Sequence, residues 1–421
     1  MKLTPVLVCG YGRSGTTALM ALLSTDPRVA FDREYPFEDR WLTYLAKFSL
    51  LTGRPGPSRH VDAVQLNDYD DDHFGPVPWW APGPADRTPL MPSPSRCFHA
   101  LWQEFSASAR AADERFTHYG EKVPEWLPAA LRDEVPCRVI GLVRDPRDVF
   151  LSARAFVRAR GAVGFGMQPG TTELEDARNT AHKLLSYYEN TRSVGPRSDA
   201  ITIRYEDLAR TPMDCAARVS AFLELDLEPA AAPAGYLDSH RTSADVEASI
   251  GRWKREPLSP SVRVCLETHL LQLLTEHGYE LSEAGTPPFE VVPDPQMACS
   301  PDGRLCVSNG RTFVTVTGGD FSVLLPPHPL PAKSDDEIWI CLRGDTGDHC
   351  SVYWRGAREP FVEERSSHIP FRPGRHWQIL RMKVGQHPLW QGSIEQIRVD
   401  LLNGVVVPGR GGEIRWVRYV H

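Results

Sequence analysis

The feature that most constrains this chain is a glycine-rich loop near its N-terminus, residues 10–17, with the sequence GYGRSGTT. The apolar residues 6–9 before it predict a short buried strand, and residues 16–24 after it carry apolar side chains at helical spacing. Glycines let a backbone wrap tightly, and the free N–H groups at the start of a helix attract an anion. A strand, a glycine-rich loop and a helix in this order predict a phosphate-binding site.

Two well-known phosphate loops match this segment only in part. Its three glycines fit the G-x-G-x-x-G of a Rossmann dinucleotide site, and Glu34 lies at about the distance of a ribose-binding acid. That acid should end a clear second strand, however, and residues 28–32 make a poor one. A Walker A loop would need lysine where this chain has Thr16, because that lysine contacts the β- and γ-phosphates of a nucleoside triphosphate.

The loop resembles the 5′-phosphosulfate-binding loop of PAPS-dependent sulfotransferases, which carry P-R-S-G-T-T or a close variant after the first strand. Gly12 replaces the usual proline. The residues that match the pattern are Arg13, Ser14, Gly15, Thr16 and Thr17. The resemblance implies that they bind the 5′-phosphosulfate of PAPS (3′-phosphoadenylyl sulfate) and that Arg13 also carries charge that develops during transfer.

A second motif, RDPRDVFLS at residues 144–152, follows a predicted buried strand (RVIGLV) and opens a predicted helix. Asp145 is suited to cap that helix and Pro146 to fill its first position. An ordinary capped helix start with solvated charges also explains the segment taken alone. It is similar to the 3′-phosphate-binding motif of the same family, which implies that Arg144 and Ser152 hold the 3′-phosphate of PAPS.

Sulfuryl transfer to a hydroxyl needs a base for the hydroxyl proton and cations for the charge that develops on oxygen. Glu34 follows Arg13 at a spacing similar to that of tyrosylprotein and some bacterial sulfotransferases, which implies that Glu34 is the catalytic base. A solvated surface carboxylate is the plain alternative for this residue. Glu38 and Asp39 are further candidate bases in the same stretch.

The segment GEKVP at residues 120–124 is similar to the E-K-x-P or K-x-P turn of the family. This resemblance implies that Lys122 stabilises the bridging oxygen, and it makes Glu121 a rival base, as in the heparan-type branch. An exposed lysine before a proline turn is the plain alternative. Two later segments, YEDL from Tyr205 and GRWK around Arg252, are also similar to family segments and imply that both residues lie at the cofactor.

The order of predicted elements indicates two domains. Strands that alternate with helices in the first two-thirds predict an α/β domain, a P-loop-like three-layer parallel sheet with helices on both faces, over residues 1–282. Residues 283–296 form a proline-rich linker. Residues 53–95, rich in Pro and Trp with Trp79 and Trp80 near the centre, are expected to shape an acceptor site.

Residues 297–421 predict an all-β, jelly-roll-like sandwich, because β-branched and aromatic runs alternate there with Gly and Pro turns. The run IEQIRVDLLNG and the later GEIRWVRY resemble the closing strands of jelly rolls related to carbohydrate-binding modules. Aromatic side chains in a sandwich mostly fill the core, but some stack on sugars. The candidates for such a platform are Trp339, Trp354, Trp377, Trp390 and Trp416.

Composition excludes several classes. The 47 Lys and Arg against 54 Asp and Glu give a net charge of −7, which argues against a nucleic-acid partner or a polybasic membrane surface. No apolar run is long enough for a membrane helix, and the N-terminus lacks the pattern of a signal peptide. The nine Cys lack the paired spacing of a zinc site, so we expect no metal and idle thiols in a cytoplasmic protein.

Together these features predict a sulfotransferase that moves a sulfuryl group from PAPS to a hydroxyl of a small molecule or glycan and releases PAP. The appended sandwich favours a carbohydrate or glycosylated acceptor. A nucleotide- or carbohydrate-binding scaffold without catalysis is the main alternative, and a Rossmann NAD(P)-dependent oxidoreductase is a weaker one. The sequence leaves the oligomeric state open.

Overall fold

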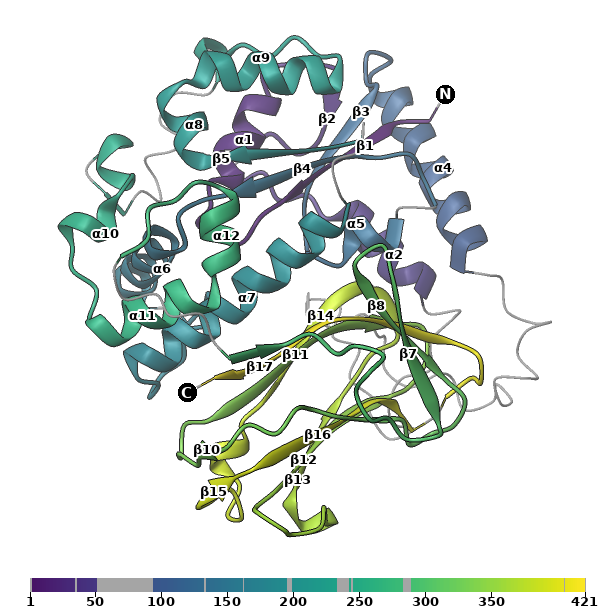
Figure 1. Ribbon diagram of the computed structural model, residues 1–421. Coiled ribbons are helices and arrows are strands. Elements are labelled where there is room, and N and C mark those ends of the chain that lie inside the picture. Colours follow the sequence, from purple (N-terminus) through teal and green to yellow (C-terminus); the bar gives the residue numbers. More distant parts are fainter. Residues whose placement is uncertain are drawn as a thin grey trace. The chain divides into compact units, whose positions relative to one another are not determined.

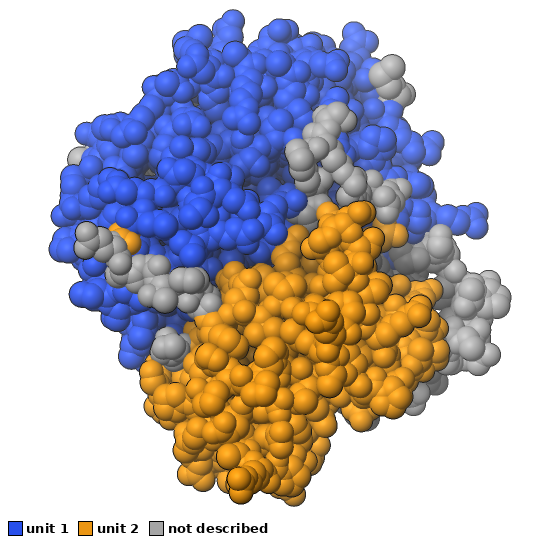
Figure 2. All heavy atoms as spheres, viewed as in Figure 1, with its two compact units in different colours: residues 1–281 blue, residues 282–421 orange. Residues whose placement is uncertain are grey.

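The computed structural model describes residues 2–34, 36–50, 94–131, 134–161, 163–194, 199–232, 242–243, 245–282, 289–404 and 406–420. The chain divides into two compact units, Met1–Leu281 and Ser282–His421, which are coloured separately in Figure 2. Most of the predicted acceptor segment at 53–95, including Trp79 and Trp80, lies outside the described residues, as does the start of the predicted linker.

The first unit is built on a parallel sheet. Its strands are β1 (Thr4–Cys9), β2 (Val29–Ala30), β3 (His118–Val123), β4 (Arg138–Val143) and β5 (Ala200–Arg204). Their order is β2-β3-β1-β4-β5, and every neighbouring pair is parallel. Since β1 lies between β3 and β4, the glycine-rich loop at its carboxyl end stands near the middle of the sheet edge.

Helices cover both faces of this sheet, as predicted (Figure 1). They are α1 (Thr16–Leu23), α2 (Trp41–Leu50), α4 (Pro94–Ala112), α5 (Leu127–Leu131), α6 (Pro146–Arg160), α7 (Glu173–Val194), α8 (Tyr205–Arg210), α9 (Pro212–Leu223), α10 (Arg252–Arg255), α11 (Pro260–His269) and α12 (Leu271–Glu276), with short turns η1 (Pro229–Ala231) and η2 (Glu247–Ser249). Val6 and Val8 pack with α1 and α9, whereas Leu7 and Cys9 pack with α2, α4 and α5. Because successive side chains of β1 point to opposite faces of the sheet, this strand contributes residues to a separate apolar core on each face.

Local chemistry explains where the best-predicted helix begins and ends. The Asp145 side chain accepts a hydrogen bond from the Arg147 N–H at 3.0 Å, Pro146 fills the first turn of α6, and Gly161 ends the helix with φ 63°. One expectation was wrong. Residues 120–123 of the segment GEKVP are the end of strand β3 rather than a turn, and Pro124 follows the strand.

The second unit contains antiparallel sheets around one apolar core. One sheet has the order β14-β11-β17-β8-β7, with β6 also paired to β17, and another has the order β13-β12-β16-β9; β10 and β15 form a small ribbon. The strands are β6 (Phe289–Val291), β7 (Gly303–Ser308), β8 (Arg311–Val316), β9 (Ser322–Leu324), β10 (Leu330–Pro331), β11 (Glu337–Gly344), β12 (His349–Arg355), β13 (Ser366–Pro370), β14 (Gly374–Met382), β15 (Ser393–Ile394), β16 (Gln396–Asn403) and β17 (Gly411–Val420), with turns η3 (Glu363–Arg365) and η4 (Val384–Gln386). The core takes Ile340 from one sheet and Val352 and Val399 from the other, which is the packing of a sandwich.

The five tryptophans proposed as a sugar platform are buried. Each is 5 % exposed or less. Trp354 and Trp390 belong to the apolar core, and Trp377 lies under the guanidinium groups of Arg343 and Arg415, at 4.8 and 4.1 Å. A stacking platform requires an exposed ring face, so these residues do not form one.

Candidate functional site

The glycine-rich loop joins β1 to α1 in a tight turn. Gly15 precedes α1 with φ 96°, and a Cβ there would lie 2.4 Å from Cδ2 of Tyr205, so both backbone conformation and space require glycine. Arg13 also has a positive φ, 72°, which is uncommon for a side chain of this size. The loop therefore holds a constrained backbone, of the kind found where a chain approaches a ligand closely.

A cavity of about 300 Å³ opens beside this loop. Arg13 and Thr17 line it from the loop, Arg144 from the end of β4, and Ser152 from α6. The nucleotide-binding residues predicted from the sequence that line it are Arg13, Gly15, Thr16, Thr17, Arg144, Ser152, Tyr205 and Arg252. Ser14 is buried and does not line the cavity. The fold thus brings two motifs from distant parts of the chain to one place.

Two arginines line this cavity. Arg144 Nη1 donates a hydrogen bond to the Arg13 carbonyl at 2.9 Å, and Nη2 donates one to the Ser249 carbonyl at 2.7 Å. The buried Nε of Arg144 has no hydrogen-bond partner among the described residues. Burial, followed by the charge of Arg144, lowers the pKa of Arg13 to about 10, so the Arg13 guanidinium stays charged at neutral pH. Two like charges and an unpartnered donor in one cavity fit a multiply charged anion.

Hydroxyl groups connect the wall of the cavity. Arg13 Nε donates to Ser152 Oγ at 3.3 Å, and Ser152 Oγ lies 3.1 Å from the hydroxyl of Thr242. Arg252 donates from Nη1 to the same Thr242 at 3.3 Å, while its Nε and Nη2 bind the Glu256 carboxylate at 2.6 and 2.8 Å. Arg252 is therefore fixed at the wall by an ion pair before any ligand is bound.

Asp148 in α6 holds the segment that carries Arg252. Its carboxylate accepts hydrogen bonds from the N–H groups of Gly251 and Trp253 at 2.6 and 2.9 Å. Burial and the nearby Asp145 raise the pKa of Asp148 to about 6. Sequence reasoning did not assign Asp148 a role, although its place in the RDPRD run was a usable signal.

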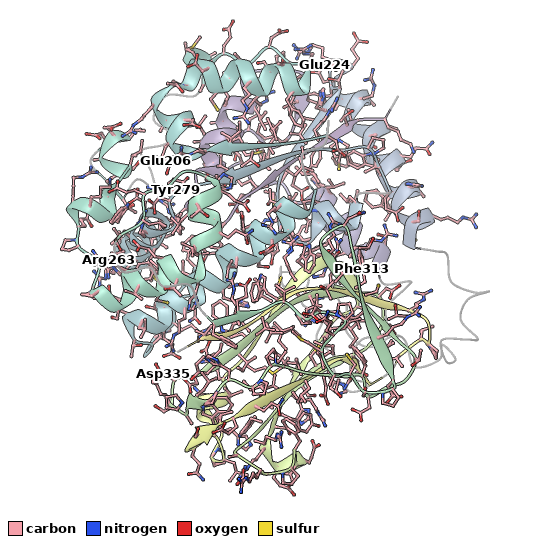
Figure 3. All side chains as sticks on the ribbon, viewed as in Figure 1. Glu206, Glu224, Arg263, Tyr279, Phe313 and Asp335 are labelled. Atoms are coloured by element: carbon pink, nitrogen blue, oxygen red, sulfur yellow. The ribbon has the colours of Figure 1, made fainter. Side chains whose placement is uncertain are left out.

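Glu206 of α8 connects three parts of the chain. Its Oε1 accepts a hydrogen bond from the Asp145 N–H at 3.1 Å, and its Oε2 accepts one from the Tyr279 hydroxyl at 2.9 Å. Glu206 and Tyr279 are labelled in Figure 3, where they lie next to each other. Because Asp145 follows Arg144 directly, this network fixes the strand end from which Arg144 reaches the cavity.

Lys122 reaches the loop from the end of β3. Its Nζ donates hydrogen bonds to Thr17 Oγ1 at 2.9 Å and to the Pro36 carbonyl at 2.6 Å, and it lies 3.4 Å from Glu38 Oε1. Burial lowers the pKa of Lys122, and the charge of Glu38 opposes this shift. Lys122 is thus a partly desolvated cation at the N-terminus of α1.

Glu121 points to the other face of the sheet, since neighbouring residues of a strand alternate. It is fully buried and accepts hydrogen bonds from the N–H groups of Leu42 and Thr43 at 2.7 and 3.0 Å, and from the Tyr119 hydroxyl at 3.0 Å. Burial raises the pKa of Glu121 to about 7. This carboxylate caps the start of α2 from a neighbouring strand, and it does not line the cavity.

The other carboxylates proposed as the base lie in the segment after β2. Glu34 is exposed, and its carboxylate has no hydrogen bond or ion pair among the described residues. Glu38 contacts both Lys122 and Arg40, the latter at 2.9 Å. Asp39 accepts a hydrogen bond from the Asp32 N–H at 2.8 Å, and burial raises its pKa. Of the three, only Glu38 contacts Lys122, and neither Lys122 nor any of the three carboxylates lines the cavity.

Two further features are absent from the part of the chain that the structure describes. Among the described residues, no set of three or more His, Cys, Asp or Glu side chains is arranged to hold a metal ion. Across the same parts of the chain, no helix is both long and apolar enough to cross a membrane.

A parallel sheet, a glycine-rich loop at a helix start and two arginines at one cavity define an α/β protein with a site suited to phosphate groups. A family model described as "Sulfotransferase family" matches residues 5–229, more than half of the chain. The chain therefore belongs to the sulfotransferase family. This assignment confirms the class of enzyme and PAPS as the sulfuryl donor, and it excludes the Rossmann oxidoreductase.

Several solved structures are similar in part. The sulfotransferase domain of the olefin synthase of Synechococcus PCC 7002 is 18% identical, with a TM-score of 0.39 over 67% of this chain and 97% of that one. The sulfotransferase domain from the curacin biosynthetic pathway is 17% identical, with a TM-score of 0.39 over 67% of this chain and 99% of that one. A C-terminal CBM6 domain of a laminarinase from Zobellia galactanivorans is 14% identical, with a TM-score of 0.23 over 31% of this chain and 99% of that one. No curated protein matches the sequence.

Proposed function

We propose that this sulfotransferase binds PAPS in the cavity beside the glycine-rich loop and transfers the sulfuryl group to a hydroxyl of a carbohydrate or glycosylated acceptor. One observation carries the placement of the donor: Arg13 and Arg144, from two separate motifs, meet at one cavity with Arg144 Nε unpartnered. We assign catalysis to residues 1–282 and an accessory sandwich to 297–421; of the linker expected at 283–296, β6 (Phe289–Val291) pairs with β17 and so adds a strand to the sandwich.

Each anionic end of the donor has its own set of residues in this proposal. The loop N–H groups of residues 15–17, with the hydroxyls of Thr16 and Thr17, hold the 5′-phosphosulfate at the start of α1, while the Ser14 N–H donates to the Tyr11 carbonyl at 3.1 Å and shapes the loop. Arg144 and Ser152 hold the 3′-phosphate, and Tyr205 and Arg252 complete the wall. When bound, PAPS supplies an activated sulfuryl group whose sulfur is joined to phosphate through an oxygen.

The reaction then needs a proton acceptor and charge stabilisation. The acceptor hydroxyl oxygen forms a bond to sulfur, the bond between sulfur and the phosphate oxygen breaks, and the hydroxyl proton passes to a carboxylate. Lys122 and Arg13 stabilise the negative charge on the bridging and sulfuryl oxygens. The hydrogen bond from Lys122 to Thr17 supports this role, because it holds the ammonium at the loop that would bind the phosphosulfate.

Two carboxylates are candidates for the catalytic base. Glu34 is the base that the motif spacing implies, and its exposed carboxylate is free to meet a bound acceptor. Glu38 is the second candidate, because it lies 3.4 Å from Lys122 Nζ. We expect Glu34→Gln to abolish turnover with PAP affinity unchanged, whereas Glu38→Gln should alter turnover less; the reverse result would make Glu38 the base.

A direct test separates the enzyme from a non-catalytic scaffold. The full chain is titrated with PAP by calorimetry, and turnover is measured with PAPS on a panel of glycans and phenols, with products identified by the mass gain of one sulfuryl group. Binding of PAP with sulfation of a glycan supports the proposal. PAP binding without turnover on any acceptor favours the scaffold, sulfation of phenols alone overturns the carbohydrate acceptor, and absence of PAP binding overturns the donor site.

A further inference from the structure

A residue outside the loop, Phe165, leaves no room for a side chain at Gly12. The φ of Gly12 is not in the left-handed region, so its backbone conformation is open to other residues. A Cβ at Gly12 would lie 2.3 Å from Cε1 and 2.8 Å from Cδ1 of Phe165, distances that real Cβ contacts do not reach. The Phe165 ring, more than one hundred residues away in sequence, therefore excludes a side chain at Gly12.

The Phe165 ring is held firmly in this place. Its backbone has φ 55°, a conformation that is a genuine outlier for a bulky residue and persists only where the surroundings enforce it. Gly164 and Met167 form an isolated antiparallel bridge around it. Two side chains of α7 fasten the turn: Thr180 donates to the Phe165 carbonyl at 3.4 Å, and Asn179 donates to the Gly166 carbonyl at 2.9 Å.

Phe165 also reaches Arg13 by a second route. Its ring packs edge-on against Phe156, with centroids 5.5 Å apart at an interplanar angle of 83°. The Arg13 guanidinium in turn lies 4.6 Å above the Phe156 ring. The Phe165 ring thus restricts the backbone next to Arg13 by its contact with Gly12. The Arg13 guanidinium lies on the Phe156 ring, against which Phe165 packs.

We propose that Phe165 is a positioning residue for Arg13: by packing on Gly12 and on Phe156 it fixes the loop backbone and the guanidinium toward Ser152 and the donor cavity. This inference rests on the proposed role of Arg13 in binding the donor. Phe165 takes no part in the chemistry itself. It acts through Arg13, and it accounts for a glycine where the related loops carry proline.

A double-mutant cycle on the full chain tests this inference. The four proteins are the wild type, Gly12→Ala, Phe165→Ala and the double variant, and the measurements are PAP affinity, the kinetic constants for PAPS and the unfolding temperature. We expect Gly12→Ala to weaken PAP binding by about tenfold or more, and the double variant to bind PAP about as well as Phe165→Ala alone, rather than with the product of the two losses. Phe165→Ala should raise KM for PAPS by about tenfold with kcat reduced less than about threefold.

The control is Gly164→Ala in the same turn, because a Cβ there meets no atom within 4 Å and φ is not left-handed. It should match the wild type. Strictly additive effects, or Gly12→Ala with wild-type affinity, would overturn the inference. If Gly12→Ala does not fold, recovery of a folded double variant supports the contact and failure to recover it overturns the contact. Absence of PAP binding by the wild type would instead reject the donor site, while the unfolding temperatures still report on Gly12 and Phe165.

Discussion

The Lys122 ammonium donates a hydrogen bond of 2.9 Å to the Thr17 hydroxyl, which joins the end of β3 to the first turn of α1. The register of the sheet makes this contact possible, since Lys122 is paired with Val8 two residues before the loop begins. The same ammonium binds the Pro36 carbonyl and lies near Glu38. The Lys122 ammonium, carried by the sheet, therefore contacts both the glycine-rich loop and the segment that carries the candidate bases.

Replacing Lys122 with methionine should remove catalysis more than binding. Since Lys122 is expected to stabilise charge that develops only during transfer, Lys122→Met should lower kcat by about 10²- to 10³-fold and change PAP affinity by less than about threefold. Steady-state kinetics with PAPS and calorimetry with PAP check this. Lys333→Met, at an exposed position of the second unit, is the control. Turnover within about threefold of wild type would show that Lys122 is not catalytic.

Removing the Ser152 hydroxyl should affect only ligands that carry a 3′-phosphate. Ser152→Ala loses one hydrogen bond to a charged group, so PAP affinity should fall by about tenfold. Affinity for adenosine 5′-monophosphate, which has no 3′-phosphate, should stay unchanged in the same titration. Ser308→Ala, exposed on β7, is the control. An equal loss of affinity for both nucleotides would show that Ser152 does not bind the 3′-phosphate.

Glu121 should contribute a pH dependence to stability. Burial raises its pKa in the folded protein from 4.5 to about 7. Between these values the folded protein keeps a proton that the unfolded chain has released, so the free energy of unfolding falls as pH rises through this window. Urea unfolding from pH 4.5 to 8 should show a smaller fall in Glu121→Gln than in wild type.

The same variant also tests whether Glu121 is a base. Because Glu121 caps α2 rather than lining the cavity, folded Glu121→Gln should keep its turnover. Glu104→Gln, exposed on α4, should leave both the pH dependence and turnover as in wild type. Loss of turnover in a stable Glu121→Gln protein would restore Glu121 as the base.

Asp148 should control the order of the segment that carries Arg252. Asp148→Ala leaves the N–H groups of Gly251 and Trp253 without their acceptor, which should lower the free energy of unfolding by about 2–4 kcal/mol and weaken PAP binding. Hydrogen exchange should show faster exchange at those two amides. Asp214→Ala, exposed on α9, is the control. Unchanged protection of both amides would contradict the role given to Asp148.

The structure confirms the fold class. This class could be predicted because the sequence patterns that indicate it are local. The strand, loop and helix around Arg13, the Asp145 cap with Pro146, and the alternating runs of the second unit depend on residues close in sequence. The same holds for the motifs that resemble known phosphate sites, because their residue types stand at fixed spacing. Where a prediction needed the partner of a strand, it was less reliable: GEKVP was expected to be a turn, and pairing with β1 makes it a strand.

The sequence by itself predicted the two units, the glycine-rich loop between a strand and a helix, and most of the residues that line the cavity beside it. The tertiary structure alone decided that Glu121 caps a helix while Lys122 faces the loop, since one residue of strand register sends neighbouring side chains to opposite faces of the sheet. It also decided that Gly12 must remain glycine, because the Phe165 ring arrives from a distant turn. Such contacts join residues at least 78 positions apart, and no local pattern specifies which of them will meet.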